Sequence, residues 1–407
     1  MSMEMRPILS AMRRNKFGAL LIAVQMAVTL AFLANALTLI QQRLALSDRP
    51  TGIDEADIFV ILTEVVDHPK NLGAHQAADL GALRSLGGVI DAYATNNYPL
   101  EGGGSLQTVD LTANQQISNA LSAYYFGDEH ALHTLGVKLI AGRNFTADEI
   151  AERTADNIPH ASGFIVTQAL ASRLFPGGDA LGKSVYVELQ TASPIIGIVE
   201  RFQSPFTTAS GQLSAAAENS VLAPYRMIGE SSAYLVRAAP GRLDAVMKSA
   251  EAKLLEIDGE RILRTKSMRQ LRESAYRGNH GLVVLLSSIC IALLAVTALG
   301  IVGLTSYWVT QRRRQIGIRR ALGATQRAIV RYFQTENFLI GAAGALLGIA
   351  LAILLNIWMV SHFEMVRLHN SHAIFGALLI LLLGQLAVLW PALRAGSIAP
   401  ALATRGE

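Results

Sequence analysis

Three groups of residues in this sequence have types and spacings that could support chemistry, and the first has the letters of a phosphate-binding loop. Residues Gly177–Ser184 (GGDALGKS) fit the pattern GxxxxGK[ST] at every fixed position. In a nucleotide-binding protein this loop follows a strand and opens a helix, so that backbone N–H groups and the helix N-terminus face the phosphates. Here a helical pattern that ends at Pro176 comes first, and a strand-like alternation at Val185–Leu189 follows. The sequence therefore predicts a helix–turn–strand connection and no ATP site in this chain.

The second group consists of His362, His369 and His372, which lie in one short stretch between two apolar runs. Imidazole is a common zinc ligand, but spacings of seven and three residues are not those of a compact zinc site on one helix. No cysteine and no pair of acids accompanies them, and no Ser–His–Asp order can be read elsewhere. We expect no metal site and no catalytic centre here, and therefore a chain that is not an enzyme.

The third group is an arginine-rich segment in which apolar residues are interleaved. Seven arginines follow Gln311, and no acid occurs before Glu336. The spacing of apolar and basic residues predicts a short helix along the membrane surface. A topological stop signal explains the arginines, but only docking into a groove of a partner protein gives the apolar stripe a use. The predicted docking residues are Ile316, Gly317, Ile318, Arg319, Arg320, Ala321, Leu322, Gly323, Ala324 and Thr325.

The elements that position these groups are largely apolar. Hydrophobic residues make up 51% of the 407 residues, charged residues make up 16%, and the mean hydropathy is +0.34. An ordinary soluble domain has roughly 25% charged residues. Four stretches without Asp, Glu, Lys or Arg are each at least about as long as the roughly 20 residues that cross a bilayer. They are residues 17–40, 281–309, 338–360 and 373–393. Four transmembrane helices are predicted, and a soluble enzyme and a disordered chain are excluded.

The distribution of charge orients these predicted helices. Basic residues gather before the first apolar stretch and between the second and the third, whereas residues 41–280 carry 21 basic and 27 acidic side chains. By the positive-inside rule, both termini are expected in the cytoplasm. The sequence pI of 9.2 then reflects membrane topology, and we expect no nucleic-acid partner. The first apolar run is longer than the core of a signal peptide, so it is expected to remain as an anchor.

Polar residues within the predicted helices are few. None of the four stretches contains an acid or a base, which argues against proton- or sodium-coupled transport. The polar side chains at Gln25, Thr29, Asn35, Asn356 and Gln385 are predicted to form hydrogen bonds between helices. The single cysteine, Cys290, lies in the second stretch, so no disulfide can form within the chain.

The predicted fold class is an α+β membrane protein: four transmembrane helices with a large mixed α+β extracytoplasmic domain inserted between the first and the second. Strand-like runs occur at residues 57–62, 184–189, 195–199 and 233–237, and helical spacing occurs at 75–86, 167–175 and 243–257. Residues 233–265 resemble a strand–helix–strand unit. The predicted segments are a cytoplasmic N-terminus 1–16, helix 17–40, extracytoplasmic domain with stalk segments 41–280, helix 281–309, cytoplasmic coupling segment 310–337, helix 338–360, short extracytoplasmic loop 361–372, helix 373–393 and cytoplasmic tail 394–407.

Several of these motifs are similar to those of one known family. Ile316–Thr325 (IGIRRALGAT) resembles the signature of FtsX-type permeases, the family that includes the MacB macrolide exporters and the lipoprotein-releasing permeases. Leu135–Arg143 (LGVKLIAGR), Ala171–Lys183 and Ile196–Val199 are similar to motifs of MacB-like periplasmic core domains. Pro391–Leu402 is similar to the closing PAxRA…PxxAL pattern of the family. The resemblance extends over almost the whole chain.

The resemblance implies the permease subunit of a mechanotransmission-type ABC transporter in the bacterial inner membrane. In this family two permeases pair, as a homodimer or with a second similar permease, and each binds an ABC ATPase subunit. Residues 316–325 would then contact the ATPase, and residues 44–50 and 269–280 would form a stalk. The outer domain would bind the exported substrate (a peptide, an antibiotic or a lipid-linked molecule) or a periplasmic adaptor that leads to an outer-membrane channel.

The same resemblance gives an expectation about ATP. Full-length MacB exporters carry their ATPase ahead of the first helix, but only sixteen residues precede it here. We therefore expect a separate ATPase subunit, with ATP bound by that partner and no cofactor in this chain. This departure from MacB also leaves the substrate open.

Two alternatives remain within the family. One is an FtsX-like regulatory membrane protein that uses ATP-driven motion to switch an extracytoplasmic hydrolase and exports nothing. The other is a lipoprotein-releasing permease. The long segment 41–280 with MacB-like motifs favours export or extraction, because FtsX itself has a short outer domain.

Overall fold

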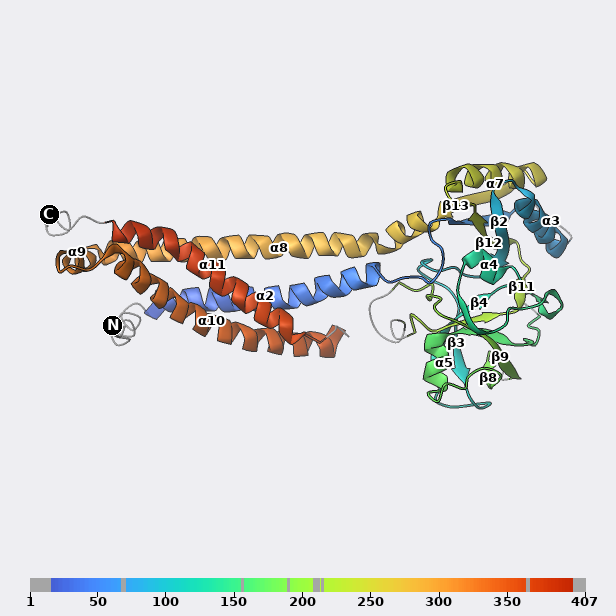
Figure 1. Cartoon of the computed structure of the whole chain (residues 1–407), viewed down its shortest axis with the longest axis horizontal. Coiled ribbons are helices and arrows are strands. Elements are labelled where there is room, and N and C mark those ends of the chain that lie inside the picture. Colours follow the sequence, from blue (N-terminus) through green and yellow to red (C-terminus); the bar gives the residue numbers. More distant parts are fainter. Residues whose placement is uncertain are drawn as a thin grey trace. The chain divides into compact units, whose positions relative to one another are not determined.

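The computed structural model describes residues 16–66, 71–154, 157–188, 191–207, 213, 216–363 and 367–397. The chain divides into two compact units (Figure 1). Unit 1 comprises residues 1–44 and 279–407, and unit 2 comprises residues 45–278. Most of the expected cytoplasmic termini, and parts of the segments 207–220 and 361–372, lie outside the described residues.

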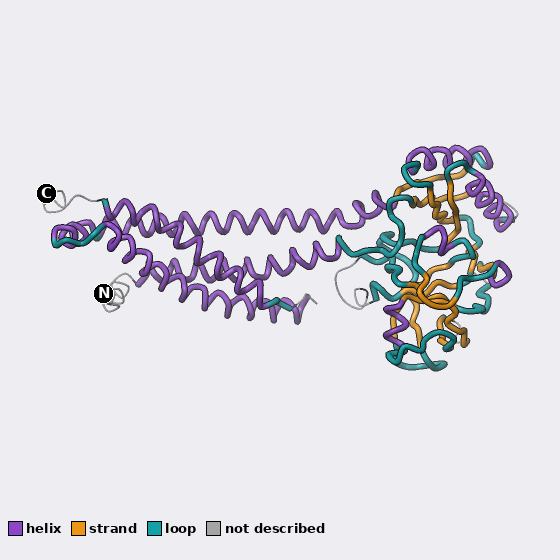
Figure 2. Tube along the Cα trace, in the orientation of Figure 1, coloured by secondary structure: helices purple, strands orange, loops and turns teal. Residues whose placement is uncertain are grey.

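Unit 1 is helical, and the strands of the described chain all lie in unit 2 (Figure 2). Among the residues that the structure describes, four helices are long and apolar enough to cross a membrane. They contain the four predicted apolar stretches, and a short fifth helix, α9, precedes the third of them. The helices are α2 (Lys16–Ser47), α8 (Met268–Gln311), α9 (Arg313–Ala321), α10 (Gln326–Phe363) and α11 (Asn370–Gly396).

Helix α2 lies at the centre of unit 1. In its most apolar window 50% of the residues are buried, against 11% for α8. Glycines let α10 approach α2 closely: a Cβ on Gly344 would lie 2.8 Å from the carbonyl oxygen of Ala23, and one on Gly348 would lie 3.0 Å from that of Ala27. Small residues at this spacing therefore pack two helices of the same chain together.

The predicted hydrogen bonds between helices are confirmed for most of the intramembrane polar residues. Thr29 Oγ1 lies 2.9 Å from Thr297 Oγ1, and Gln25 Nε2 donates to the carbonyl of Val296 over 3.1 Å. Asn35 accepts a bond of 3.1 Å from Asn356 Nδ2. Gln385 differs, because its buried Nε2 has no partner among the described atoms.

Unit 2 contains a four-stranded antiparallel sheet built in the order β–α–β–β–α–β. Its spatial order is β13-β1-β12-β2, so the two strands of the predicted unit at 233–265 are separated by β1. The prediction of that unit was incomplete for this reason: β12 and β13 both pair antiparallel with a strand made much earlier in the chain. The elements are β1 (Ile58–Val65), α3 (Leu72–Ser85), β2 (Val89–Thr95), β12 (Ser231–Ala238), α7 (Leu243–Ile257) and β13 (Arg261–Ser267).

The residues between β2 and β12 form a second β structure. Its strand order is β5-β9-β7-β10-β4-β3-β8, and β8 also pairs with β9, so that six of these strands close into a ring. We call this ring the barrel; β5 pairs with β9 outside it. The strands are β3 (Leu106–Asp110), β4 (Ala120–Phe126), β5 (Leu139–Gly142), β7 (Phe164–Thr167), β8 (Ser184–Val187), β9 (Thr191–Val199) and β10 (Ser220–Ala223).

Shorter elements complete this region of unit 2. A two-stranded pair, β6 with β11, is parallel. A capping box is present at Thr146–Glu149, at the start of η1. The elements are α4 (Ala131–Leu135), η1 (Ala147–Glu149), β6 (Ala151–Arg153), α5 (Gln168–Leu174) and β11 (Tyr225–Met227).

Strand alternation joins the barrel to the four-stranded sheet. Along β4, Tyr124 and Phe126 point into the core of the barrel, whereas Ala123 and Tyr125 belong to a core shared with β1, β2 and β12. The other face of the four-stranded sheet packs against α3 and α7. Because the side chains of a strand alternate between its two faces, a single strand can serve both cores. The predicted α+β class is confirmed.

Candidate coupling site

Helix α9 follows α8 with a single intervening residue, Arg312. The α-helical hydrogen bonds continue through this residue, because its N–H donates to the carbonyl of Trp308 and its own carbonyl accepts from Ile316, both over 3.0 Å. The helix expected along Ile316–Thr325 therefore starts at Arg313 and ends at Ala321. It is attached to α8 without a flexible linker.

The structure divides the predicted docking residues between two environments. Ile316 is 6% exposed and belongs to the buried core of unit 1, together with Ile329 and Phe333, and Gly317 beside it is also buried. The prediction that Ile316 shares an exposed stripe with the other apolar residues was wrong, because α9 turns this face toward the bundle. Ile318 and Ala321 are exposed, and Leu322 is exposed to 83%.

The turn after α9 depends on Gly323, whose φ of +94° lies in the left-handed region. Its N–H donates to the carbonyl of Arg320, and Ala324 N–H donates to that of Arg319. No atom lies within 4 Å of the position where a Cβ would stand, so conformation and not space requires glycine. Thr325 then caps α10, since its Oγ1 accepts from Ala328 N–H over 3.2 Å.

The arginines of this segment also differ in their surroundings. The guanidinium of Arg319 lies 5.2 Å from the ring centre of Tyr332 on α10. Arg312 donates to both carboxylate oxygens of Glu336, at 2.9 and 3.1 Å. Sequence reasoning noted Glu336 only as the first acid after the arginines and did not pair it. The signal that could have found the pair was this single acid among seven arginines.

The predicted stalk segments are joined by a second arginine. Arg272, near the start of α8, donates to the carbonyls of Ser47 (2.6 Å) and Arg49 (3.0 Å) and to both carboxylate oxygens of Glu55 (2.6 and 2.7 Å). Burial raises the pKa of Glu55, but the hydrogen bonds from Arg272 and Thr51 outweigh it and hold the pKa below its usual value. Nothing in the sequence pointed to this contact.

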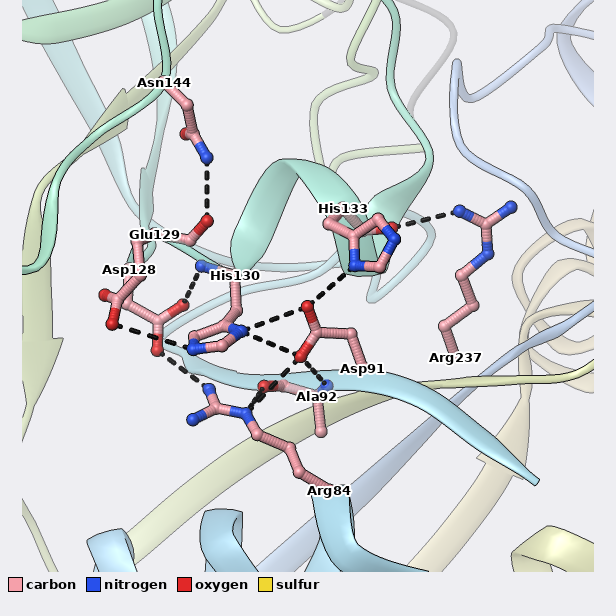
Figure 3. Close-up of polar contacts among 9 residues, drawn as sticks. All are labelled: Arg84, Asp91, Ala92, Asp128, Glu129, His130, His133, Asn144 and Arg237. Carbon is pink, nitrogen blue, oxygen red and sulfur yellow. Dashed lines mark hydrogen bonds and ion pairs between the residues drawn. The ribbon is translucent and has the colours of Figure 1, made fainter. Parts of the chain in front are cut away.

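A further polar cluster in unit 2 is centred on Asp91 of β2 (Figure 3). His133 Nδ1 lies 2.9 Å and His130 Nδ1 3.1 Å from Asp91 Oδ2, and the N–H of Ala92 donates to Oδ1. Because a carboxylate only accepts, both imidazoles carry a proton on Nδ1 in this arrangement. Burial raises the pKa of Asp91, and the hydrogen bonds from His133, His130 and Ala92 reverse this and lower it.

The Asp91 cluster connects three elements. Arg84 of α3 lies 3.4 Å from Asp91 Oδ1 and donates to Asp128 Oδ2 over 3.3 Å. Asp128 accepts from His130 N–H at the start of α4. The cluster thereby ties α3 and β2 to α4. No group of three or more His, Cys, Asp or Glu side chains within the described residues has the arrangement of a metal site.

The histidines singled out in the sequence lie apart from this cluster. His372 Nδ1 is 3.0 Å from Thr38 Oγ1, and the rings of His369 and His372 are 6.1 Å apart. His362 contacts Ser361 and Trp358 on its own helix.

The GGDALGKS run has the context that the sequence predicts. Helix α5 ends at Leu174 before it, and strand β8 begins at Ser184 after it. Gly178 and Gly182 have φ values of +83° and +78°, as expected for a turn. Lys183 Nζ forms an exposed ion pair with Asp179 over 3.3 Å. The helix that would present its N-terminus to a phosphate is not on the required side of the loop.

The backbone conformation explains the two glycines of the LGVKLIAGR motif. Gly136, with φ +68°, ends α4 in the left-handed conformation. Gly142, with φ +78°, lies so close to β9 that a Cβ would be 2.1 Å from the carbonyl oxygen of Ile196. Leu135 is buried in the core shared by the sheet and the barrel. The motif thus places β5 against the barrel.

Comparison with known proteins matches both parts of the chain to family models. Residues 19–253 match the MacB-like periplasmic core domain, and residues 287–400 match the FtsX-like permease C-terminal domain. "Macrolide export ATP-binding/permease protein MacB" of Neisseria gonorrhoeae is 26% identical over 283 residues, which are 64% of this chain and 38% of that protein. "Probable syringafactin export ATP-binding/permease protein SyfD" of Pseudomonas syringae pv. tomato is 25% identical over 317 residues, 74% of this chain and 42% of that protein.

The chain therefore spans about two fifths of the length of these curated relatives. Among solved structures, the periplasmic region of MacB from Actinobacillus actinomycetemcomitans is similar with a TM-score of 0.36 and 17% identity. That match covers 55% of this chain and 94% of the solved one.

Proposed function

Since the chain belongs to the MacB/FtsX-like family of ABC transporter permeases, we propose that it relays ATP-driven motion of a separate ATPase subunit to its outer domain. The proposed outcome is export or extrusion of a substrate such as a peptide, an antibiotic or a lipid-linked molecule. The names of the two relatives, a macrolide exporter and a syringafactin exporter, support export as the class of function. ATP is bound by the partner in this proposal, and the chain itself is not an enzyme.

The observation that carries the proposal is the exposed end of α9. Leu322 is exposed to 83%, and Ile318 and Ala321 are exposed near it, although Ile316 on the same helix is fixed in the core. A short helix with one face anchored and an apolar tip exposed among arginines suits a groove with an apolar floor and an acidic rim. We assign this groove to the ATPase.

An ATPase at α9 also sets the topology and the other partners of the chain. The α9 side of the membrane is the cytoplasm, and both chain termini lie there, as the arginine distribution favours. The membrane is the bacterial inner membrane. The permease pairs with a second copy or with a similar permease, and the outer domain contacts the substrate or a periplasmic adaptor of an outer-membrane channel.

The decisive experiment places a charge at the proposed contact. Leu322→Asp buries a carboxylate in the groove, at a cost of several kcal/mol if it stays unpaired. Ile117→Asp is the matched control, because Ile117 in unit 2 is exposed to 82%. We expect Leu322→Asp to reduce co-purification of the native ABC ATPase at least about tenfold, and Ile117→Asp to leave it unchanged. Retention of the ATPase by Leu322→Asp would contradict the docking role.

Orientation is tested separately. Cysteines are placed at Gly103 and at Gln326 in a Cys290→Ser background. A membrane-impermeant thiol reagent should label the first only from outside and the second only after the inner face is opened. Labelling of both from the outside would contradict the proposed topology.

A further inference from the structure

The ion pair between Arg312 and Glu336 stands at the junction of α8 and α9. Arg312 is the only residue between these two helices, and its side chain reaches Glu336 on α10. The side chains are exposed to 14% and 4%. Two hydrogen bonds from one guanidinium nitrogen to both carboxylate oxygens hold the junction to one point on α10.

The charges near this ion pair explain why Arg312 and Glu336 pair with each other. Residues 310–337 contain seven arginines and one acid. The neighbouring Arg313 and Arg314 are exposed to solvent, whereas Glu336 is buried. A buried carboxylate without a cation is costly, so Arg312 and Glu336 depend on each other.

Two further contacts bring the same part of α9 onto the same part of α10. Arg319 lies over Tyr332, one helical turn before Glu336. Ile316 is buried in a core that includes Phe333. Because α9 continues the hydrogen-bonded backbone of α8, a displacement of α9 moves α8 and α10 together only while these contacts hold.

We propose that the Arg312–Glu336 ion pair is the joint that holds α10 to the α8–α9 junction, so that a displacement of α9 moves α8 and α10 as one body. This inference rests on the proposed function, in which the ATPase moves α9. Both residues are positioning residues that act through helices, since neither belongs to the exposed docking surface. Helix α8 runs unbroken from this joint to Met268, which directly follows β13 of unit 2. Loss of the joint should therefore separate ATP hydrolysis from the response of β13.

The test uses the full complex of permease and ATPase in lipid nanodiscs. Glu336→Gln keeps the shape of the side chain and removes its charge, the double variant Arg312→Glu/Glu336→Arg exchanges the charges, and Arg314→Gln is the exposed control. Three quantities are measured: co-purified ATPase, the rate of ATP hydrolysis, and hydrogen exchange at the amides of β13 with and without ATP plus vanadate.

Glu336→Gln should bind the ATPase and hydrolyse ATP within about twofold of wild type, while the ATP-dependent change in exchange falls at least about fivefold. The charge-exchanged variant Arg312→Glu/Glu336→Arg should restore at least half of the ATP-dependent change in exchange. Arg314→Gln should behave as wild type. A purely structural role would move all three quantities together.

Three results would overturn the inference: a wild-type exchange response in Glu336→Gln, loss of ATPase binding in that variant, or a folded charge-exchanged variant without restoration. If Glu336→Gln does not fold, the charge-exchanged variant alone decides between the two outcomes. Absence of ATPase binding by the wild-type chain would instead contradict the proposed function, and the inference with it, before any variant is compared.

Discussion

The two ends of helix α8 are each held by an arginine, and the two arginines are held in different ways. At the unit 2 end, Arg272 donates to two backbone carbonyls and to one carboxylate, that of Glu55. At the unit 1 end, Arg312 donates to both oxygens of a single carboxylate, that of Glu336. The first contact binds three different points of the chain, whereas the second depends on one charge.

Because of this difference, we expect Arg272 to contribute to stability and Arg312 to the transmission of motion. Backbone carbonyls keep their partial charge, so the hold of Arg272 on the start of α8 does not depend on a single carboxylate. The buried pair at the other end is strong only while both side chains stay aligned. Unit 2 is thus expected to lose stability when its arginine is removed, and unit 1 to lose coupling.

The largest expected effect comes from removing the contact in unit 2. Arg272→Ala deletes hydrogen bonds to Ser47, Arg49 and Glu55 and leaves a half-buried carboxylate without its cation. We expect a loss of about 3 kcal/mol in the free energy of unfolding. Thermal unfolding of the detergent-purified chain measures it, with the exposed Arg264→Ala on β13 as control. Equal melting temperatures for Arg272→Ala and Arg264→Ala would mean that Arg272 does not stabilise unit 2. The two ends of α8 would then not differ in the way described.

The second prediction concerns another carboxylate of unit 2 that accepts hydrogen bonds from several donors. Asp91 accepts from His133, His130 and Ala92 N–H, and its pKa is lowered. A carboxylate with a lowered pKa stabilises the fold above its unfolded pKa of about 3.9, and this contribution is lost as the pH falls through the folded pKa. Asp91→Asn should therefore cost about 2 kcal/mol at pH 7 and progressively less below pH 4.

Thermal unfolding of Asp91→Asn and wild type across this pH range measures the difference. The Arg264→Ala variant again serves as control, since its difference from wild type should not change in the same window. A gap between Asp91→Asn and wild type that widens toward acid would contradict the expected sign of the pH dependence.

At the unit 1 end, a smaller and local effect is expected at Gly323. Its φ of +94° strains a β-branched residue, whereas asparagine tolerates the left-handed region. Gly323→Val should raise hydrogen exchange at amides 318–324 about tenfold, and Gly323→Asn by no more than about threefold. Because no atom lies near the Cβ position, steric crowding does not enter. Similar exchange in both variants would mean that the turn is not set by this φ.

The smallest effect is expected at Lys183, because its ion pair with Asp179 is exposed to solvent. Lys183→Ala should change the free energy of unfolding by less than about 0.5 kcal/mol. ATP hydrolysis by the assembled complex should stay at the wild-type rate, because the loop has a turn structure and the proposed ATP site belongs to the partner. Loss of nucleotide binding in a folded Lys183→Ala variant would restore the phosphate-loop interpretation.

Local sequence signals predicted the elements whose stability has a local cause. Four uncharged apolar stretches predicted four helices, because length and hydropathy alone decide whether a segment can span a bilayer. The helical spacing at residues 167–175 predicted α5 to within one residue at each end. The spacing of Leu243–Ile257 predicted α7 with its observed ends.

Long-range pairing was not readable in the same way. The barrel closes where β8 meets both β3 and β9, and β1 enters between β12 and β13, both through registers that no local pattern encodes. The burial of Ile316 was missed because nine helical residues define an apolar face but not what it packs against. Arg272 and Glu55 are 217 positions apart, and each resembles any other surface charge in the sequence.

The interleaved order of the strands has a consequence for how the chain is made. Strand β1 lies in the interior of the four-stranded sheet, yet both of its partners, β12 and β13, begin more than 160 residues later. At a synthesis rate of about 5–20 residues per second, β1 waits about 10–40 s until both have been made. During that interval the apolar run IFVILTEV has two unpaired edges, and it is open to pairing with another chain. The first strand to be synthesised is therefore the one that most needs protection until synthesis of unit 2 is complete.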